Sequence, residues 1–305
     1  MLFKLIEIIN CLMKILTIIL SLFIITEANA DIKGSVLSKA SDKISEYTIG
    51  LIPGEGITEF DIQLSDKDDN DPRLNLLLLR NLNKTDKSNF FTQMSLHTQD
   101  VGVSDLRYIG NFGLGYRMLS DDNSFMFGAN LFYDRDLQED HSRASLGLEA
   151  KAGILDFHFN HYEAASLQKI VDGTKEQSLG GMDYTLATEV PYMPWMKFNF
   201  TGYKHEADLA SEDTKGKKYI SEMNLTSSLV FEVEYDESGN NADDFTSARI
   251  TFVYPPRNSN PSLVDGFLST DAFRTKDMST TLSQKVKRNN NIAIETQGAV
   301  IITVQ

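Results

Sequence analysis

The chain has little cysteine and no long apolar stretch after its first 30 residues. Its only cysteine is Cys11, so the remainder has no disulfide and no thiolate chemistry. The densest later apolar run, Leu74 to Leu79, is broken by Asn75 and ends at Arg80. Because a spanning helix needs about 20 consecutive apolar residues, no transmembrane helix is predicted there.

Basic charge and catalytic patterns are scarce as well. The sequence has 29 Lys and Arg against 43 Asp and Glu, a net charge of −14, which repels phosphate backbones and excludes nucleic acid as a partner. Gly113 and Gly115 lack the third glycine of a dinucleotide loop. No serine, histidine and acid arrangement has a nucleophile context. We therefore expect no enzyme activity and no cofactor.

The first 30 residues have the order of a secretory signal peptide. Lys4 and Lys14 precede or flank an apolar run from Ile15 to Ile25, and Ala28-Asn29-Ala30 gives a small-x-small cleavage site. The alternative is a single membrane anchor, but the run is shorter than the roughly 20 residues that a spanning helix needs. We predict that residues 1–30 are a signal peptide and that the protein is exported.

From Ile57 onward, apolar and polar residues alternate with a period of two. Adjacent side chains on a strand point to opposite faces, so each strand has one apolar stripe. The opposite stripes carry charges that lipid would not tolerate, and we predict that these line a watery lumen. A soluble β-sandwich with its charges outward fits the same alternation. The six predicted pore-lining residues are Arg143, Glu149, Lys151, Glu232, Glu234 and Arg249.

The spacing of turns favours a barrel over the sandwich. Tight turns at 120–123, 152–154 and 226–228 alternate with longer polar loops at 135–142, 163–178, 206–216 and 237–244. Short turns on one rim, long loops on the other and an even strand number are typical of outer-membrane barrels. We predict an all-β, twelve-stranded antiparallel transmembrane barrel over residues 57–255. Its strands are expected at 57–64, 73–80, 90–98, 108–118, 124–134, 143–151, 155–162, 179–190, 196–205, 217–226, 229–236 and 245–254.

Aromatic residues and glycines stand at particular places in these strands. Tyrosines and one tryptophan fall near predicted strand ends, where they suit the two membrane interfaces, although strand propensity explains any single tyrosine equally well. Glycines inside strands indicate close packing or bends in the barrel wall. The aromatic residues are Trp195, Tyr192, Tyr116, Tyr133 and Tyr254, and the glycines are at 110, 113, 115 and 128.

The segments that flank the predicted barrel differ from it. Residues 31–56 are predicted to form a short periplasmic helix that ends at Pro53-Gly54-Glu55-Gly56. After Pro255-Pro256 the chain is polar, and we predict a linker over 256–291 that is helical from Thr275 to Arg288. The tail, residues 292–305, has a strand-like pattern.

Several strand motifs resemble the intimin/invasin family. Asn111–Arg117 is similar to its N-x-G-x-G-x-R strand, and Gly128–Asp134 and His141–Glu149 are similar to its next two strands. Asn160-His161-Tyr162 stands where the family has a similar N-x-Y, and Val286–Ile292 resembles its post-barrel linker. The resemblance extends over most of the chain after the predicted signal peptide.

This resemblance implies an inverse autotransporter translocation domain, a twelve-stranded barrel with a periplasmic N-terminus. In that family the linker after the last strand returns through the pore, and an adhesive C-terminal passenger emerges outside. Two departures exist. Residues 31–56 leave no room for a periplasmic peptidoglycan-binding module, and residues 292–305 are far shorter than an immunoglobulin-like domain of about 100 residues. We therefore expect no recognisable passenger: a reduced relative, a truncated gene or a barrel with another task.

The linker supplies the candidate functional residues. Lys285, Lys287 and Arg288 are predicted to close the pore by facing the acidic residues Glu149, Glu232 and Glu234; a solvated basic helix end is the alternative. The predicted linker residues are Arg288, Asn289, Asn290 and Asn291. The leading function is a barrel that anchors or exports its own C-terminal segment. The alternatives are a small solute-conducting pore and a soluble periplasmic β-sandwich that binds a ligand.

One acidic loop has part of the residue spacing of a calcium site. Asp66, Asp68 and Asn70 have the spacing of the first ligands of a calcium loop, but the glycine at its sixth place and the glutamate at its twelfth are absent. A solvated outer loop is favoured, and no metal is predicted. The expected location is the cell outer membrane. The expected partners are its lipid and lipopolysaccharide, the barrel-assembly machinery and periplasmic chaperones.

Overall fold

The computed structural model describes residues 54–66, 72–101, 106–210, 212–239, 244–257, 259–296 and 299–301. The chain divides into two units, residues 1–52 and 53–305, and every described residue belongs to the second. The predicted signal peptide and the predicted N-terminal helix lie outside the described residues. So do Asp68 and Asn70 of the acidic loop.

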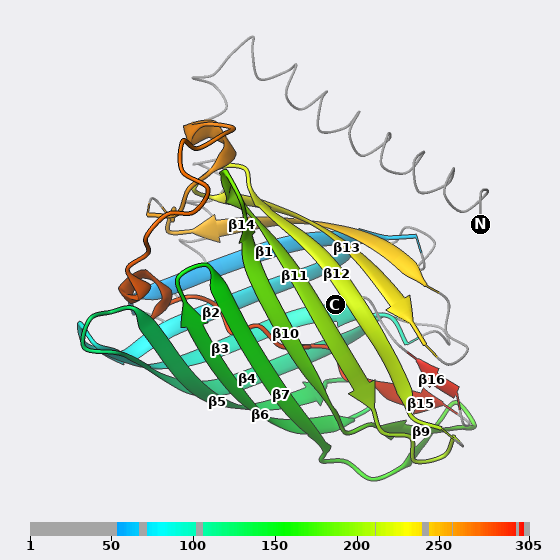
Figure 1. Ribbon diagram of the computed structural model, residues 1–305. Coiled ribbons are helices and arrows are strands. Elements are labelled where there is room, and N and C mark those ends of the chain that lie inside the picture. Colours follow the sequence, from blue (N-terminus) through cyan, green and yellow to red (C-terminus); the bar gives the residue numbers. More distant parts are fainter. Residues whose placement is uncertain are drawn as a thin grey trace, which may run out of the picture. The chain divides into compact units, whose positions relative to one another are not determined.

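Twelve strands close into one antiparallel barrel in the described part of the chain (Figure 1). Chain neighbours pair around the ring, β7 pairs with β10, and β1 pairs with β14 to close it. The twelve-stranded barrel is therefore confirmed, and the sandwich alternative is wrong. The barrel strands are β1 (Gly56–Ser65), β2 (Arg73–Lys84), β3 (Ser88–Gln99), β4 (Arg107–Leu119), β5 (Phe125–Asp136), β6 (Ser142–Ala152), β7 (Leu155–Ala164), β10 (Gly181–Val190), β11 (Met193–His205), β12 (Thr214–Asn224), β13 (Leu229–Ser238) and β14 (Phe245–Tyr254).

The two faces of the barrel wall have opposite chemistry. Apolar side chains such as Phe127 and Leu131 are exposed on the outside, by 52% and 62%. Their neighbours in β5, Asn130 and Asp134, are buried. An apolar outer face matches hydrocarbon, and a polar inner face matches a lumen. Among the described residues, no helix combines the length and the apolar character that crossing a membrane requires.

The two rims also differ. At one rim the strands are joined by tight turns, such as 85–87, 120–124 and 191–192. At the other rim the connection from β7 to β10 contains a hairpin, β8 (Lys169–Val171) and β9 (Thr174–Ser178), which the sequence analysis assigned to a loop. The hairpin was missed because its two strands are only three and five residues long and neither has an apolar alternation.

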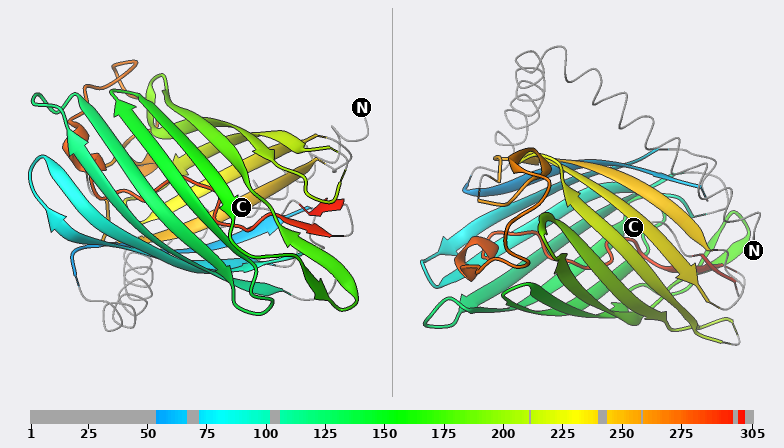
Figure 2. Two further views of the ribbon diagram at one scale, coloured as in Figure 1. Left: turned by 90° about the horizontal axis from the view of Figure 1, so that it is seen from below. Right: turned by 45° about the horizontal axis from the view of Figure 1, so that its top comes forward.

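The predicted linker helix is wrong. The described residues 275–288 contain only one turn of 3₁₀-helix, η2 (Met278–Thr281). Another such turn, η1 (Leu263–Asp265), lies earlier in the linker. The chain then runs without regular structure through the barrel and ends in β15 (Ile294–Thr296) and β16 (Ala299–Ile301) (Figure 2). A helix satisfies its own backbone groups, but this segment bonds to the wall instead. The tail is thus strand-like where it is described.

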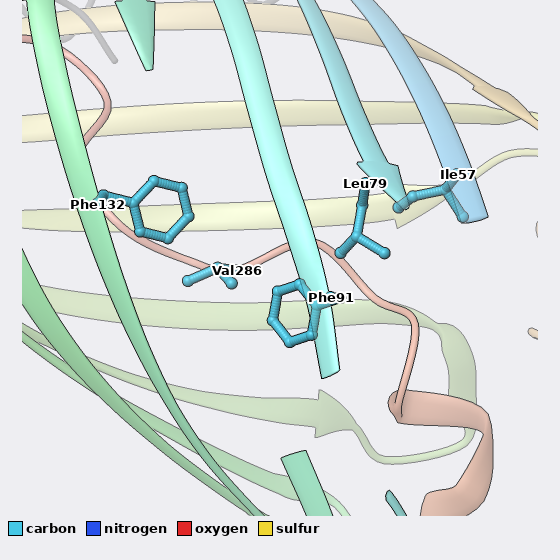
Figure 3. Close-up of a cluster of buried hydrophobic side chains, with 5 residues drawn as sticks. All are labelled: Ile57, Leu79, Phe91, Phe132 and Val286. Carbon is cyan, nitrogen blue, oxygen red and sulfur yellow. The ribbon is translucent and has the colours of Figure 1, made fainter. Parts of the chain in front are cut away.

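Two apolar clusters pack the linker against the barrel wall near the tight-turn rim and farther along the lumen. Met278 and Leu282 pack with Met126, and Val286 lies farther along in a second cluster. Figure 3 shows this second cluster, in which side chains from β1, β2, β3 and β5 meet Val286 of the linker. Its members are Ile57, Leu79, Phe91, Phe132 and Val286. The linker therefore contributes to the interior packing of the barrel.

Trp195 corrects the interpretation of the aromatic residues. It is buried, and its Nε1 donates a hydrogen bond to the carbonyl oxygen of Phe267 at 2.9 Å, with the two rings 5.7 Å apart. It therefore fastens the linker at the tight-turn rim and does not face lipid. Tyr116 and Tyr133 are exposed on the outer face, as an interface position requires.

Candidate functional site

The candidate site is the lumen, because residues 282–292 pass through it from the tight-turn rim to the long-loop rim (Figure 2). A barrel of about eight strands has an interior that side chains alone can fill, and twelve strands leave more room. An extended polypeptide fits this extra space. Its backbone groups then need partners, since buried N–H and C=O groups are almost always hydrogen-bonded.

Amide side chains of β3 supply these partners. The Nδ2 of Asn89 donates to the carbonyl oxygen of Leu282 at 2.8 Å, and the backbone N–H of Val286 donates to Oε1 of Gln93 at 2.8 Å. Gln99 bonds Ile292 twice: its Nε2 donates to the carbonyl at 2.7 Å, and its Oε1 accepts from the N–H at 2.9 Å. Side chains of β3 thus make hydrogen bonds to the linker backbone that a neighbouring strand would make in a sheet.

Gln99→Leu is expected to loosen the linker, because it leaves both backbone groups of Ile292 without these bonds. A cost of about 2 kcal/mol, or roughly a thirtyfold rise in the fraction of time that the pore conducts, is expected. Single-channel recording measures this. Gln63→Leu is the matched control, since Gln63 bonds Ser247 and Arg249 of the wall. Equal behaviour of the two variants would contradict this role of Gln99.

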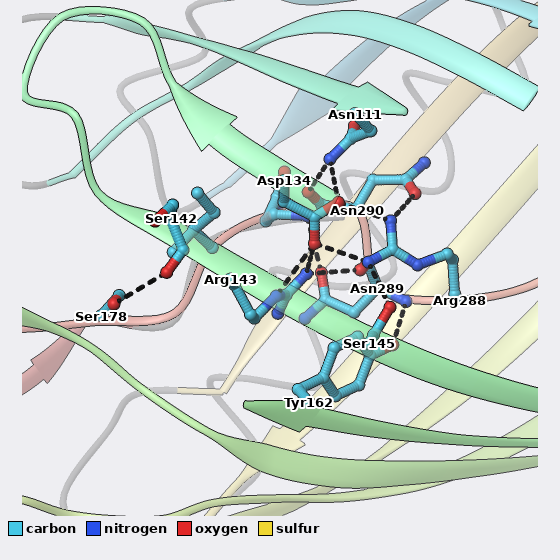
Figure 4. A network of polar contacts seen from close by, with 12 residues as sticks. Asn111, Asp134, Ser142, Arg143, Ser145, Tyr162, Ser178, Arg288, Asn289 and Asn290 are labelled. Carbon is cyan, nitrogen blue, oxygen red and sulfur yellow. Dashed lines mark hydrogen bonds and ion pairs between the residues drawn. The ribbon is translucent and has the colours of Figure 1, made fainter. Parts of the chain in front are cut away.

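Asp134 of β5 is the centre of the polar network (Figure 4). Its carboxylate accepts bonds from Arg143 of the wall at 2.8 Å and from Arg288 of the linker at 2.6 Å, and all three side chains are fully buried. Asn111 also donates to it at 2.7 Å. Guanidinium groups suit such buried pairing because they bind a carboxylate through several donors in a fixed geometry.

The network continues along the linker backbone. Arg143 donates to the carbonyl oxygen of Asn289 at 2.8 Å, and Asn111 donates to that of Asn290 at 3.0 Å. The hydroxyl of Tyr162 accepts from the N–H of Asn289 at 2.8 Å and donates to Asp183 at 2.6 Å. The segment 288–290 is therefore bonded to the wall through both its side chains and its main chain.

The linker lysines have partners other than those predicted. Lys285 pairs with Glu59 at 2.9 Å and Lys287 with Glu222 at 2.8 Å, and Arg288 pairs with Asp134. The predicted partners already have basic neighbours in the wall. Glu149 pairs with Arg117, Glu232 with Arg249 and Glu234 with Lys218. Direct pairing of the linker cations with Glu149, Glu232 and Glu234 is therefore wrong, although the linker does meet acidic side chains, and Glu232 and Glu234 line one cavity with residues 285–291.

The strand register explains why these acidic side chains already have basic partners in the wall. Glu232 and Arg249 lie directly opposite each other on β13 and β14. Arg117 and Glu149 are two strands apart, each opposite Gly128 of the strand between them. A Cβ on Gly128 would lie 2.6 Å from the Glu149 side chain, so the glycine leaves the space through which the ion pair forms. Nearby strands of the wall thus supply these acidic side chains with basic partners.

The predicted pore-lining residues lie on two sides of the linker. Arg143, Glu149 and Lys151 are on the side that contacts it, where Lys151 donates to Oε1 of Gln284 at 2.7 Å. Glu232, Glu234 and Arg249 line a cavity of about 130 Å³ together with residues 285–291. A cavity of that volume and polarity has room for several water molecules. The linker therefore leaves this cavity between itself and one part of the wall.

Sequence reasoning missed Asp134, Gln93, Gln99, Glu59 and Glu222 as linker contacts. All five stand at inward positions of their strands, so the period-two alternation is the signal that could have placed them in the lumen. Asp134 also ends one of the strand motifs that carried the family resemblance. The partner on the linker was not visible, because it is 154 residues away from Asp134 in the chain.

A second charged cluster stands at the long-loop rim. Arg107 donates to both carboxylate oxygens of Glu176 in β9 at 2.8 Å and to Asp136 at 3.2 Å. His141 lies 3.1 Å from Glu176. Burial by itself raises the pKa of Glu176, but the bonds from His141 and Arg107 and the charge of Arg107 outweigh it and lower the pKa to about 2.

This cluster predicts a pH dependence of the β8–β9 hairpin. A lowered pKa stabilises the folded hairpin above the ordinary value of 4.5, and the stabilisation is lost as the pH falls toward about 2. We expect the hairpin to resist proteolysis at pH 4 and to become cleavable between about pH 4 and 2. Acid-active protease and peptide mapping measure this. Glu176→Gln should be cleavable at every pH; protection of that variant at pH 7 would contradict the assignment.

Comparison with known proteins gives relatives of one kind. The family model described as "Inverse autotransporter, beta-domain" matches residues 20–290. The inverse autotransporter adhesin YeeJ of Escherichia coli is 23% identical over 218 residues, which cover 68% of this chain and 9% of that protein. A putative attaching and effacing protein homolog of the same organism is 28% identical over 166 residues, covering 53% of this chain and 52% of that protein.

Among solved structures, one from a study of the in-meso crystallization of membrane proteins has a TM-score of 0.60 at 19% identity. It is matched over 79% of this chain and 99% of that one, and at this identity it shows the fold alone. The chain spans about half the length of one curated relative and about a tenth of the other.

Proposed function

The chain belongs to the inverse autotransporter β-domain family, an outer-membrane barrel family, and we propose from this that it holds its own C-terminal segment across the outer membrane. In this proposal the tight turns face the periplasm and the residues after Ile292 are outside the cell. Short periplasmic turns and long outer loops are the rule for such barrels. The observation that carries the proposal is the continuous path of the linker. At the tight-turn rim the backbone N–H of Met278 donates to the carbonyl oxygen of Asn123. At the opposite end the backbone N–H of Ile292 donates to Oε1 of Gln99.

Two kinds of contact have different roles in this proposal. The wall bonds mostly main-chain groups of the linker, such as Leu282 O, Val286 N and Asn290 O, and every residue type except proline carries both of these groups. A lumen of this kind accommodates a passing chain with little regard to sequence. The pairs of Lys285, Lys287 and Arg288 depend on side chains and fix where the chain stops. No catalytic step is assigned.

Surface labelling tests the proposal. An epitope after Gln305 should bind antibody on intact cells, as should an epitope in the loop at 206–210. An epitope in the turn at 120–123 should bind only after the outer membrane is permeabilised. A tail epitope that behaves like the turn at 120–123 would contradict the proposal. Lipopolysaccharide, the barrel-assembly machinery and periplasmic chaperones are the partners we infer for a barrel in this location.

A solute-conducting pore is the second candidate, favoured by the cavity of about 130 Å³ beside the linker. Planar-bilayer conductance separates the two functions. For a barrel closed by its linker, the intact chain conducts poorly, and deletion of residues 275–305 raises the conductance several-fold. The same conductance with and without these residues would favour the pore. Heat-modifiable migration of both proteins verifies that each barrel is folded.

A further inference from the structure

The β8–β9 hairpin at the outer rim pairs with the linker where it leaves the pore. β15 aligns antiparallel to β9, with Ile294 opposite Ser178 and Thr296 opposite Glu176. The resulting sheet has the order β16-β15-β9-β8 and is separate from the barrel wall. We propose that β9 is a landing strand that captures the linker as it emerges, and that Glu295 sets the register of capture. This inference rests on the proposed function.

The hairpin has several contacts with the barrel that do not involve the linker. Glu176 is bonded by Arg107 of β4, and the hydroxyl of Ser178 donates to the carbonyl oxygen of Ser142 at 3.1 Å. Lys169 of β8 donates to the carbonyl oxygen of Glu139 at 2.6 Å. One edge of β9 pairs with β8, and the other faces the pore exit. An edge strand fixed in this way is a ready template for an incoming chain.

Glu295 is the residue that specifies one register. It is fully buried, and its carboxylate accepts hydrogen bonds from the backbone N–H groups of Asp208 at 2.9 Å and Leu209 at 2.7 Å, and from that of Ala210. Its neighbours two positions away are Ala293 and Gln297, and neither carries a carboxylate. A slip of two residues therefore leaves three amides without their anion. A slip of one reverses every side chain.

Apolar packing on the other face agrees with the same register. Ile292 and Ile294 form a buried cluster with Val101 and Ile109 of the barrel rim. The backbone N–H of Leu179 donates to the carbonyl oxygen of Ala293 at 2.9 Å, so pairing begins directly where the wall contacts end. Wall, landing strand and loop 208–210 together make a continuous path for the chain. Backward movement requires breaking these contacts at once.

Cysteine cross-linking in living cells tests this assignment in a chain that also carries Cys11→Ser. The in-register pair is Ser178→Cys with Ile294→Cys, and the shifted pair is Ser178→Cys with Thr296→Cys. We expect the in-register pair to form a disulfide at least about tenfold more than the shifted pair. Glu295→Ala should reduce the ratio of in-register to shifted disulfide about tenfold. Glu163→Ala should leave this ratio unchanged, because Glu163 is an exposed acid on β7, outside the sheet of β16, β15, β9 and β8.

The tail epitope separates the two proposals. A tail on the surface together with an absent in-register disulfide, or with a ratio that Glu295→Ala leaves unchanged, overturns the landing strand and leaves the proposed function standing. A tail that never reaches the surface overturns both. Heat-modifiable migration verifies that each variant barrel is folded before its cross-links are compared. A tail on the surface with the expected ratios supports both proposals.

Discussion

Asp134→Ala is expected to free the linker and to lower the free energy of unfolding by about 3–5 kcal/mol. The substitution leaves Arg143 and Arg288 buried next to each other without their shared carboxylate, because both donate to the oxygens of Asp134. An uncompensated buried charge costs far more than the pair itself contributes. Urea unfolding in lipid vesicles measures the stability, and planar-bilayer recording measures the opening of the pore.

Asp140→Ala is the matched control for this variant. Asp140 pairs with Arg135 on the outer turn, where the two side chains are 57% and 48% exposed. Exposed pairs contribute about 0–1 kcal/mol, so this variant should retain a closed pore. The double variant Asp134→Ala with Arg288→Met should lose less stability than the single one, since it removes one of the two stranded charges. Similar stabilities for Asp134→Ala and Asp140→Ala would contradict the central role of Asp134.

Gly115→Ala is expected to destabilise the barrel by about 1–3 kcal/mol through overpacking of the lumen. A Cβ at this position would lie 2.3 Å from the Phe91 ring, and Arg117 stacks on that ring at 4.5 Å. The ring also contacts Val286 of the linker through their shared cluster. Displacing it therefore disturbs both the Arg117–Glu149 pair and the linker. The measurements are urea unfolding and pore conductance.

Gly110→Ala tests whether the effect depends on the inner face. Gly110 lies on the same strand, but a Cβ there meets its nearest atom, from Leu137, at 3.8 Å, an ordinary contact. This variant should unfold like the unaltered protein. Gly113→Ala should behave like Gly115→Ala, since its Cβ would lie 2.4 Å from the Phe132 ring. Destabilisation by Gly110→Ala as large as by Gly115→Ala would argue for a general loss of glycine and against overpacking.

The amino-acid sequence was sufficient to predict the barrel. Alternation with a period of two is a local property of an extended backbone, so it identified both the twelve strands and the inward face of Arg143, Glu149 and Arg249. Turn lengths are local as well, and they separated the two rims. The family resemblance predicted a linker that passes through the pore, and the path of residues 282–292 agrees with it.

The contacts of the linker, in contrast, depend on the closed barrel and could not be predicted from local patterns. Asp134 and Arg288 meet because ring closure brings residues 154 positions apart together, and no local pattern encodes that distance. The helical pattern of residues 275–288 failed for the same reason: side chains of the wall replaced the internal hydrogen bonds that a helix would have made. The short strands β9 and β15 pair because each supplies the other with backbone partners, and β9 has no apolar alternation of its own that could have predicted it. Local periodicity thus determines the strands of the barrel wall, and contacts made across the closed lumen determine the conformation and the partners of the linker.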